Sequence, residues 1–218
     1  MTQLWWARRD LRLADNPALV EAQSTGPAAA VFAWTPALHR WSGRRRAHLA
    51  RSLWSLREST GRALAVRRGE AADAVLAAAR EAEARVVWAA REFTPSGVAE
   101  QDAVAAALAG DGRELRLHGS PYAVAPGRVV KGDGTPYRVF TPFRDAWRDH
   151  GWRAPADHAD PDAFAPLPRD AEHDIDLDQR AAHADAEDPL ESPHEFREDR
   201  VLAALEDFVA GDLERYAG

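Results

Sequence analysis

The sequence predicts an α/β fold: a Rossmann-like five-stranded parallel sheet with helices on both faces. Two observations predict it. Five short runs are apolar at consecutive positions, which is typical of parallel strands buried on both faces, and stretches with apolar residues at helical spacing separate them. Because strand–helix–strand crossovers are right-handed, this alternation favours a doubly wound sheet in the order 3-2-1-4-5. The expected strands are Leu4–Ala7, Ala29–Trp34, Ala63–Val66, Arg85–Ala89 and Leu115–Leu117.

The helices between these strands begin at residues that commonly cap helices. Asn16 can cap the first helix, with Pro17 in its first helical position, and the segment from Ser42 opens the second. Ser96 is the expected cap of the fourth helix. The apolar faces comprise Leu49, Leu53 and Leu56 in the second helix, Ala72, Val75, Leu76 and Ala79 in the third, and Val104 and Leu108 in the fourth.

Changes in composition and apolar periodicity divide the chain into three parts. Residues 1–150 form the α/β domain, which ends in a helix that Thr141 and Pro142 begin, with neighbouring aromatic side chains expected in the core. Residues 151–194 are an acidic, weakly apolar linker or surface-hugging loop. Residues 195–218 carry one more helix, Glu195–Tyr216, with an apolar stripe. The aromatics are Tyr137, Phe140, Phe143 and Trp147, and the stripe is Leu202, Leu205, Val209 and Tyr216.

Composition and charge exclude several classes of protein. The chain has no cysteine, so disulfides and thiolate metal sites are excluded, and its eight histidines show no metal-ligand spacing. The first 60 residues are mildly basic, whereas residues 155–218 are strongly acidic, so the basic signature of a nucleic-acid-binding chain is absent. No stretch approaches the length of a membrane span. We therefore expect a soluble, cytoplasmic protein without a metal site.

Candidate binding residues lie in the loops that follow the strands, where α/β sheets bind ligands. The first loop, Arg8–Pro17, contains Arg9 and Asp10 but neither G-x-G-x-x-G nor a Walker A sequence. Arg45 lies in an arginine run at the start of the second helix, where arginine opposes the helix dipole unless it faces an anion or a ring. Glu92 follows the fourth strand. Taken singly, the arginines and Asp10 are more typical of surface salt bridges or a solvated basic face, and the alternative for Glu92 is an exposed loop carboxylate.

Two motifs in sequence order resemble the DNA photolyase/cryptochrome family. The first is Arg8-Arg9-Asp10-Leu11-Arg12 followed by Asp15-Asn16-Pro17-Ala18-Leu19, and the second is the stretch from Pro136 to Phe143 with Trp147 after it. Arg45 and the run Leu49–Leu53 fit the family's second helix. The resemblance covers Leu4 to about His150 well. It extends more loosely through the acidic linker to the last helix, residues 195–218, which resembles the first helix of the family's C-terminal FAD-binding domain.

The resemblance implies that this chain is the family's N-terminal domain, which can hold a light-harvesting antenna chromophore. Arg45, Glu92, Arg9 and Asp10 are the implied cofactor-binding residues. Ser96 and Gly97 stand where folate-binding members carry an Asn-Glu pair, so the resemblance favours a deazaflavin or flavin over methenyltetrahydrofolate. Catalytic FAD belongs to a C-terminal helical domain that this sequence does not reach, so the resemblance assigns no catalytic residue here.

The implied function is the antenna domain of a deoxyribodipyrimidine photolyase, inactive in repair of ultraviolet-damaged DNA without the FAD domain. The alternatives are a cryptochrome-like light sensor or regulatory domain, and a stand-alone nucleotide-binding α/β module. The expected partners are the FAD domain and, through it, damaged DNA. The apolar stripe of the last helix makes self-association a further expectation.

Overall fold

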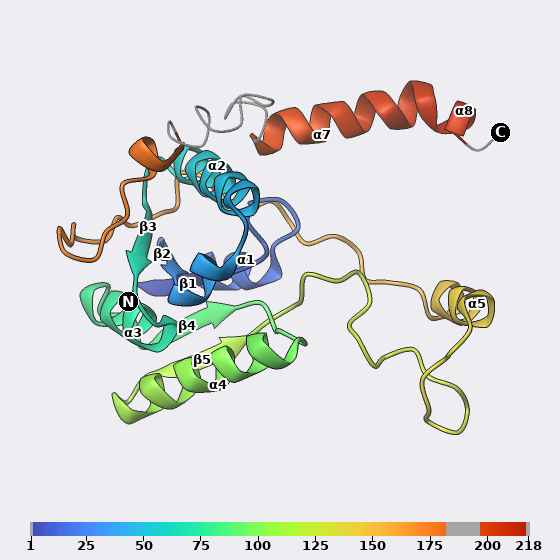
Figure 1. Cartoon of the computed structure of the whole chain (residues 1–218), viewed down its shortest axis with the longest axis horizontal. Helices are drawn as coiled ribbons and strands as arrows, with labels where there is room; N and C mark the ends of the chain where they lie inside the picture. Colours follow the sequence, from blue (N-terminus) through green and yellow to red (C-terminus); the bar gives the residue numbers. More distant parts are fainter. Residues whose placement is uncertain (1, 182–196, 217–218) are drawn as a thin grey trace.

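The structure is a computed structural model that describes residues 2–181 and 197–216. Its centre is a five-stranded sheet in the order β3-β2-β1-β4-β5, in which all four pairings are parallel (Figure 1). The predicted fold class and strand order are confirmed. The strands are β1 (Gln3–Ala7), β2 (Ala28–Trp34), β3 (Leu64–Arg68), β4 (Val86–Ala89) and β5 (Glu114–Leu117).

Helices cover both faces of the sheet because β1 and β2 are apolar on both sides. Trp5 and Trp6 are both buried and belong to different core clusters, one on each face. Beside them in the parallel register stand the smaller Ala30 and Val31. Helices α1 (Pro17–Gln23) and α2 (Gly43–Ser59) pack on the Trp5 face, and α3 (Ala71–Glu81) and α4 (Pro95–Gly110) pack on the Trp6 face.

Three of these helices begin at side-chain caps, and one cap differs from the prediction. Asn16 accepts a hydrogen bond from the Leu19 N–H, and Ser42 caps α2 after the short 3-10 helix η1 (Pro36–Arg40). Helix α4 is capped by Thr94 and not by Ser96. The reason is Pro95, which takes the first helical position and so makes the residue before it the cap.

A long excursion after β5 carries α5 (Phe140–His150) away from the layers (Figure 1). The helix begins at Phe140, one residue before the predicted Thr141–Pro142 start. The prediction that its aromatic side chains join the core is wrong: in α5, which the structure describes in full, no residue is buried, and Phe140 is 72% exposed. Its aromatic rings contact neighbours within the excursion, such as Trp147 stacked on Trp152 at 5.0 Å.

The acidic stretch after α5 follows the surface of the α/β layers as far as residue 181. Its few apolar residues are buried more deeply than a weakly apolar linker suggests: Ala159, Ile175 and Leu177 belong to the core cluster on the Trp5 face. Ile175 donates its backbone N–H to the Val66 carbonyl at 2.8 Å. The buried Arg67 guanidinium forms ion pairs with three carboxylates around it, those of Glu81, Asp170 and Asp174.

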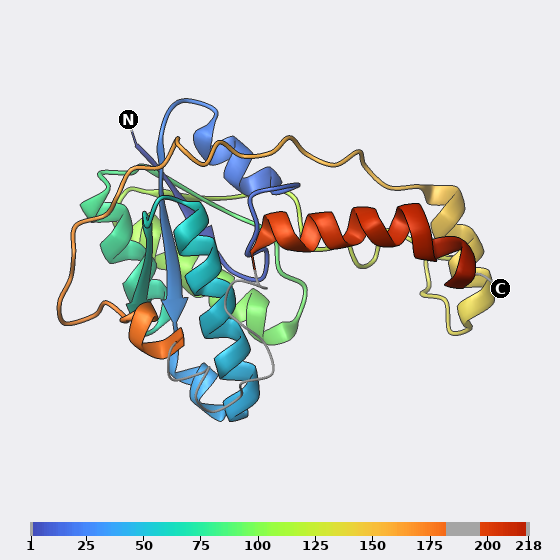
Figure 2. The same ribbon diagram turned by 90° about the horizontal axis from the view of Figure 1, so that it is seen from above.

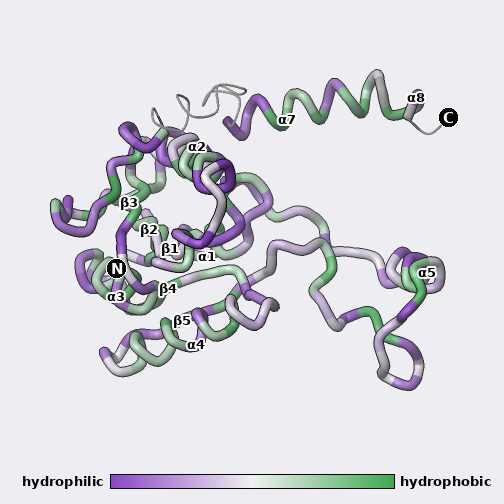
Figure 3. Tube along the Cα trace, in the orientation of Figure 1, coloured by the Kyte–Doolittle hydropathy of each residue, from purple (hydrophilic) through white to green (hydrophobic). Residues whose placement is uncertain are grey.

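The C-terminal helix begins at α7 (Glu198–Asp207), passes through the π-helical turn η3 (Phe208–Asp212) and ends in α8 (Leu213–Tyr216). Glu195 and Phe196, the predicted first residues of this helix, lie outside the described residues. Both α5 and α7 project from the same side of the α/β layers (Figures 1 and 2). Hydrophobic positions recur along α7 (Figure 3), and its leucines are exposed. None of the helices within residues 2–181 and 197–216 combines the length and apolar character needed to span a bilayer.

Leu177→Ala tests whether the apolar residues of the acidic stretch pack on the core. Leu177 is 0% exposed, so truncation removes buried methyl groups and leaves a cavity, which should lower the free energy of unfolding by about 2–5 kcal/mol. Leu205→Ala, at a leucine 56% exposed, is the matched control and should change it by less than about 0.5 kcal/mol. Urea unfolding followed by circular dichroism measures both. Equal effects of the two substitutions would show that the stretch does not pack on the core.

Candidate ligand-binding site

Two adjoining cavities open at the carboxyl ends of the strands, beside the loop after β1. The strand order reverses here, between β1 and β4. One has a volume of about 900 Å³ and the other of about 640 Å³. Crevices at such switch points are where open α/β sheets bind ligands. The two cavities share five lining residues, so they form one continuous surface; these are Arg8, Arg9, Phe32, Leu38 and Trp41.

The larger cavity lies between the loop after β1 and helix α2. Its volume falls in the range of small-molecule sites, which combine apolar walls with a few placed polar groups. Arginines from the β1–α1 loop and from α2 line it together with leucines and Trp41. Glu198, the first residue of α7, also lines it. The arginines are Arg8, Arg9, Arg12, Arg44, Arg45 and Arg51.

Arg45 lies over the ring of Trp41, with its guanidinium carbon 4.3 Å from the ring centroid. Trp41 precedes the cap residue Ser42, so the first turn of α2 sets the position of the pair. A guanidinium stacked in this way is held flat while its N–H groups remain able to donate to an anion or a carbonyl. The pair therefore offers a planar ligand an aromatic face and a cation on one wall.

Arg9 and Glu92 meet although they follow different strands. The Arg9 Nε atom lies 3.1 Å from the Glu92 Oε1 atom; the Glu92 side chain is buried, and that of Arg9 is half exposed. Gly97 makes room for this carboxylate, because a Cβ atom there would stand 2.6 Å from the Glu92 Oε2 atom. Thr94 also donates its hydroxyl to Oε2 at 3.4 Å. The loop before α4 thus forms a pocket for one carboxylate.

Arg8 fixes the wall between the two cavities. Its Nη2 atom donates to the Gly97 carbonyl at 2.9 Å and to Glu100 at 2.7 Å, and its guanidinium lies over Trp6. Within the described part of the chain, the buried Nη1 atom has no hydrogen-bond partner. A buried donor without a partner is costly, so Nη1 is a position where a ligand oxygen would be stabilised.

Asp10 lines neither cavity and instead holds the loop from inside. Its Oδ1 atom accepts the Arg8 backbone N–H at 3.3 Å, and its own carbonyl accepts from the Asn16 amide at 3.0 Å. Burial raises the pKa of Asp10, although backbone hydrogen bonds and the nearby charges of Arg12 and Arg8 oppose the rise. The carboxylate is therefore a structural group of the loop in this arrangement.

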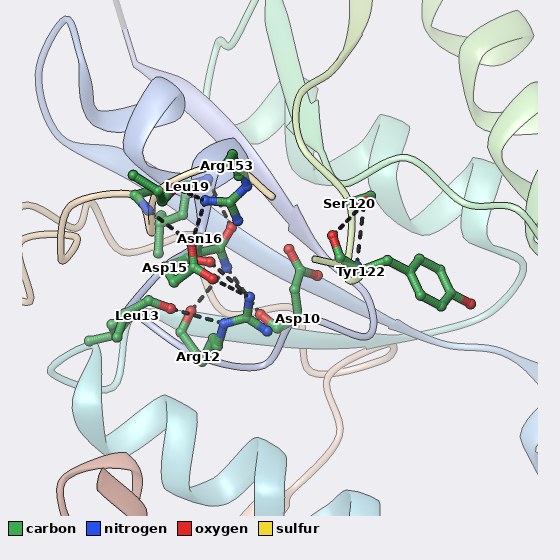
Figure 4. Close-up of polar contacts among 12 residues, drawn as sticks. Asp10, Arg12, Leu13, Asp15, Asn16, Leu19, Ser120, Tyr122 and Arg153 are labelled. Carbon is green, nitrogen blue, oxygen red and sulfur yellow. Dashed lines mark hydrogen bonds and ion pairs between the residues drawn. The ribbon is translucent and has the colours of Figure 1, made fainter. Parts of the chain in front are cut away.

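Asp15 ties the same loop to the segment after α5. It lies between the guanidinium groups of Arg12 and Arg153, at 3.3 Å and 2.6 Å (Figure 4), and accepts the Ala156 N–H at 2.9 Å. Partial burial acts to raise the pKa of Asp15, but Arg153, Ala156 and Arg12 together lower it below its ordinary value. Asp15 adopts a positive φ of 49°, which aspartate tolerates better than most residues.

The structure brings two of the four predicted site residues into contact, Arg9 and Glu92. Arg45 lines the larger cavity together with Arg9, Glu92 lines the smaller one together with Arg9, and Asp10 lines neither. Sequence reasoning missed Trp41 and Glu198. Trp41 could have been found as an aromatic residue next to the Ser42 cap. Nothing in the sequence around Glu198 indicates its role, because its partners lie at the other end of the chain.

Residues 2–181 and 197–216 contain no group of three or more histidine and carboxylate side chains placed to hold a metal ion. The larger cavity instead combines aromatic and aliphatic walls with six guanidinium groups and one carboxylate, that of Glu198. This arrangement is suited to a planar ligand that carries negative charge or carbonyl oxygens.

Comparison with known proteins agrees with the motifs. The DNA photolyase family matches residues 3–165. The deoxyribodipyrimidine photo-lyase of Thermus thermophilus is 34% identical over 217 residues, which is 98% of this chain and 46% of the relative. This chain thus spans about half the length of that relative.

Two solved structures share the fold. A class III photolyase from Agrobacterium tumefaciens superposes with a TM-score of 0.66 at 30% identity, covering 82% of this chain and 38% of that one. An archaeal photolyase from Sulfolobus tokodaii, described with two FAD molecules, superposes with a TM-score of 0.68 at 19% identity, covering 84% and 42%.

Asp10→Asn tests the role of the buried carboxyl group. Because burial raises its folded-state pKa above 3.8, the stability that Asp10 contributes is present below that value and is lost as pH rises through the raised pKa. The unfolding free energy of the wild type should therefore fall relative to the variant as pH rises from about 4 to about 8. Urea midpoints across this range measure it. Asp73→Asn, at an exposed position, is the control, and a difference for Asp10→Asn that does not change with pH would contradict the assignment.

Proposed function

Because this chain belongs to the DNA photolyase family, we propose that its α/β layers bind a light-harvesting antenna chromophore for a deoxyribodipyrimidine photolyase. The observation that carries the proposal is the larger cavity, about 900 Å³ at the carboxyl ends of the strands, which is lined by an Arg45–Trp41 stack and by arginines from the loop after β1. When bound, the chromophore would supply absorption of light and transfer of excitation energy.

The residues present fit a tricyclic ligand of flavin or deazaflavin type. Trp41 and Arg45 provide a flat wall for a ring system, and the unpartnered Nη1 atom of Arg8 is a donor for a ring carbonyl or an anionic tail. Glu92, held by Arg9, is a carboxylate that can accept a hydrogen bond from a ligand hydroxyl or ring N–H. The S. tokodaii photolyase, whose two FAD molecules are described as implying a novel light-harvesting cofactor, gives a precedent in the same fold.

A folate chromophore is less well supported. The Ser96–Gly97 segment lies in the first turn of α4, where Gly97 packs against the Glu92 carboxylate. No Asn-Glu pair stands at this turn. This is why we favour a flavin-type ring over methenyltetrahydrofolate.

Repair itself is proposed to need a second, helical domain. In the family, that domain holds the catalytic FAD and the damaged DNA, and no catalytic residue is assigned within residues 1–218. Helices α5 and α7, which project from one side of the α/β layers with exposed apolar side chains, are the surfaces proposed to meet it.

Arg45→Ala tests the antenna site. Removal of the stacked guanidinium should weaken flavin mononucleotide binding by about three- to tenfold, the range expected for loss of a partly exposed cation–π contact. Quenching of flavin fluorescence on titration measures the dissociation constant. Arg116→Ala, which removes another arginine placed over a tryptophan but outside both cavities, is the matched control. The assignment fails if neither flavin nor deazaflavin binds the unmodified chain, or if the two variants bind equally well.

The repair proposal makes a separate prediction. The polypeptide of residues 1–218, supplied with FAD and illuminated, should leave cyclobutane pyrimidine dimers in an oligonucleotide intact, because the family's dimer and FAD sites lie in the helical domain. Chromatographic analysis of the oligonucleotide measures this, with a full-length photolyase as the positive control. Light-dependent splitting of the dimers by the polypeptide alone would overturn the prediction.

A further inference from the structure

Glu198, the first residue of α7, holds the loop after β1 through two hydrogen bonds. Its Oε2 atom accepts the backbone N–H of Leu13 at 2.7 Å, and its Oε1 atom accepts that of Ala14 at 2.7 Å. Both carboxylate oxygens are thus used by consecutive amides 185 and 184 residues away in the sequence. Hydrogen bonds from N–H groups to an ionised carboxylate are about twice as strong as bonds between neutral groups.

The loop that Glu198 holds is a wall of the larger cavity. Leu11 and Arg12 line that cavity and immediately precede the two amides, and Glu198 lines it as well. Arg12 in turn donates to the carbonyls of Ala14 and Asp15, so a movement of these amides would displace the Arg12 side chain. The contact therefore joins the cavity wall to the start of the C-terminal helix.

Apolar packing does little to hold α7 in this place. Its large apolar side chains are exposed along its length, Val201 by 55% and Leu205 by 56%. The acidic side chains beside Glu198 interact locally, as in the pair of Arg197 with Asp199. A helix with few buried contacts opens at low free-energy cost, so a two-bond contact at its first residue has a large share in its position.

We propose that Glu198 is a positioning residue that couples occupancy of the cavity to docking of the C-terminal helix. The inference rests on the proposed function, because it assigns the coupled ligand to the same cavity. With Glu198 on the loop, the cavity wall is in its binding form; without it, the loop and α7 move independently. Since coupling between two sites is reciprocal, a ligand that binds the closed wall must also hold α7 more firmly.

Hydrogen exchange with and without flavin mononucleotide tests the coupling. In the ligand-free wild type, the amides of Leu13 and Ala14 should exchange slowly, and Glu198→Ala should make them exchange faster. Addition of flavin should slow exchange in residues 198–207 of the wild type but not of Glu198→Ala. A purely structural contact would not give this ligand-dependent change. Glu206→Ala, at an exposed glutamate near the end of α7, is the control and should behave as the wild type.

Affinity provides the second measurement. Glu198→Ala should weaken flavin binding by about fivefold or more, the lower end of typical coupling between sites. Glu198→Gln keeps one carbonyl acceptor and should recover part of the loss, whereas Glu206→Ala should bind as the wild type does.

The outcomes separate the two proposals. If flavin does not bind the wild type, the proposed function fails. The Glu198 contact is then tested by hydrogen exchange of the ligand-free chain: equal exchange rates of the Leu13 and Ala14 amides in the wild type and Glu198→Ala would overturn the contact. If flavin binds wild type and Glu198→Ala with equal affinity, or leaves exchange of residues 198–207 unchanged, the coupling is overturned and the antenna site stands.

Discussion

The structure depends on the burial of β1 on both of its faces. Trp5 and Trp6 point to opposite sides of the sheet, and each is removed from water by a different pair of helices. A strand with large side chains on both faces is stable only at the centre of a sheet covered by two layers. Two crossovers therefore lie on each face, and the order in which strands are added reverses beside β1. This places the switch-point crevice next to the residues that follow this strand.

The loop after β1 lines this crevice, and side-chain hydrogen bonds hold its backbone in place. Asn16 caps α1 with its amide oxygen and donates its amide nitrogen to the carbonyls of Asp10 and Arg12, so one side chain fixes both the helix start and the loop. The arginines of the loop are then held by partners from other elements: Arg8 by Glu100 and Arg9 by Glu92. A wall built in this way has its rotamers set before a ligand arrives, which lowers the entropic cost of binding.

The sequence was sufficient for the parts of the structure that follow from local pattern. Consecutive apolar residues identified the strands, and because β1 and β4 border the switch point, topology alone brought Arg9 near Glu92. It was insufficient where burial depends on distant partners. Ile175 and Leu177 are isolated apolar residues in an acidic stretch, and they become core because long-range bonds, such as the one from Ile175 to Val66, hold that stretch on the sheet. The prediction that the aromatic residues of α5 are buried was wrong for the converse reason. An apolar side chain is buried only where another surface packs against it, and α5 has no such surface among the described residues.

The β1–α1 loop also explains how segments that project from the α/β layers can remain connected to the site. Three contacts of large sequence separation meet within it: Arg8 with Glu100, Asp15 with the Ala156 amide, and the Leu13 amide with Glu198, at separations of 92, 141 and 185 residues. Each contact uses a carboxylate, and in two of the three the carboxylate accepts a backbone N–H group. These contacts therefore fix the backbone of the loop and of its partner segments. The loop that lines the cavity therefore contacts both the segment after α5 and the first residue of α7.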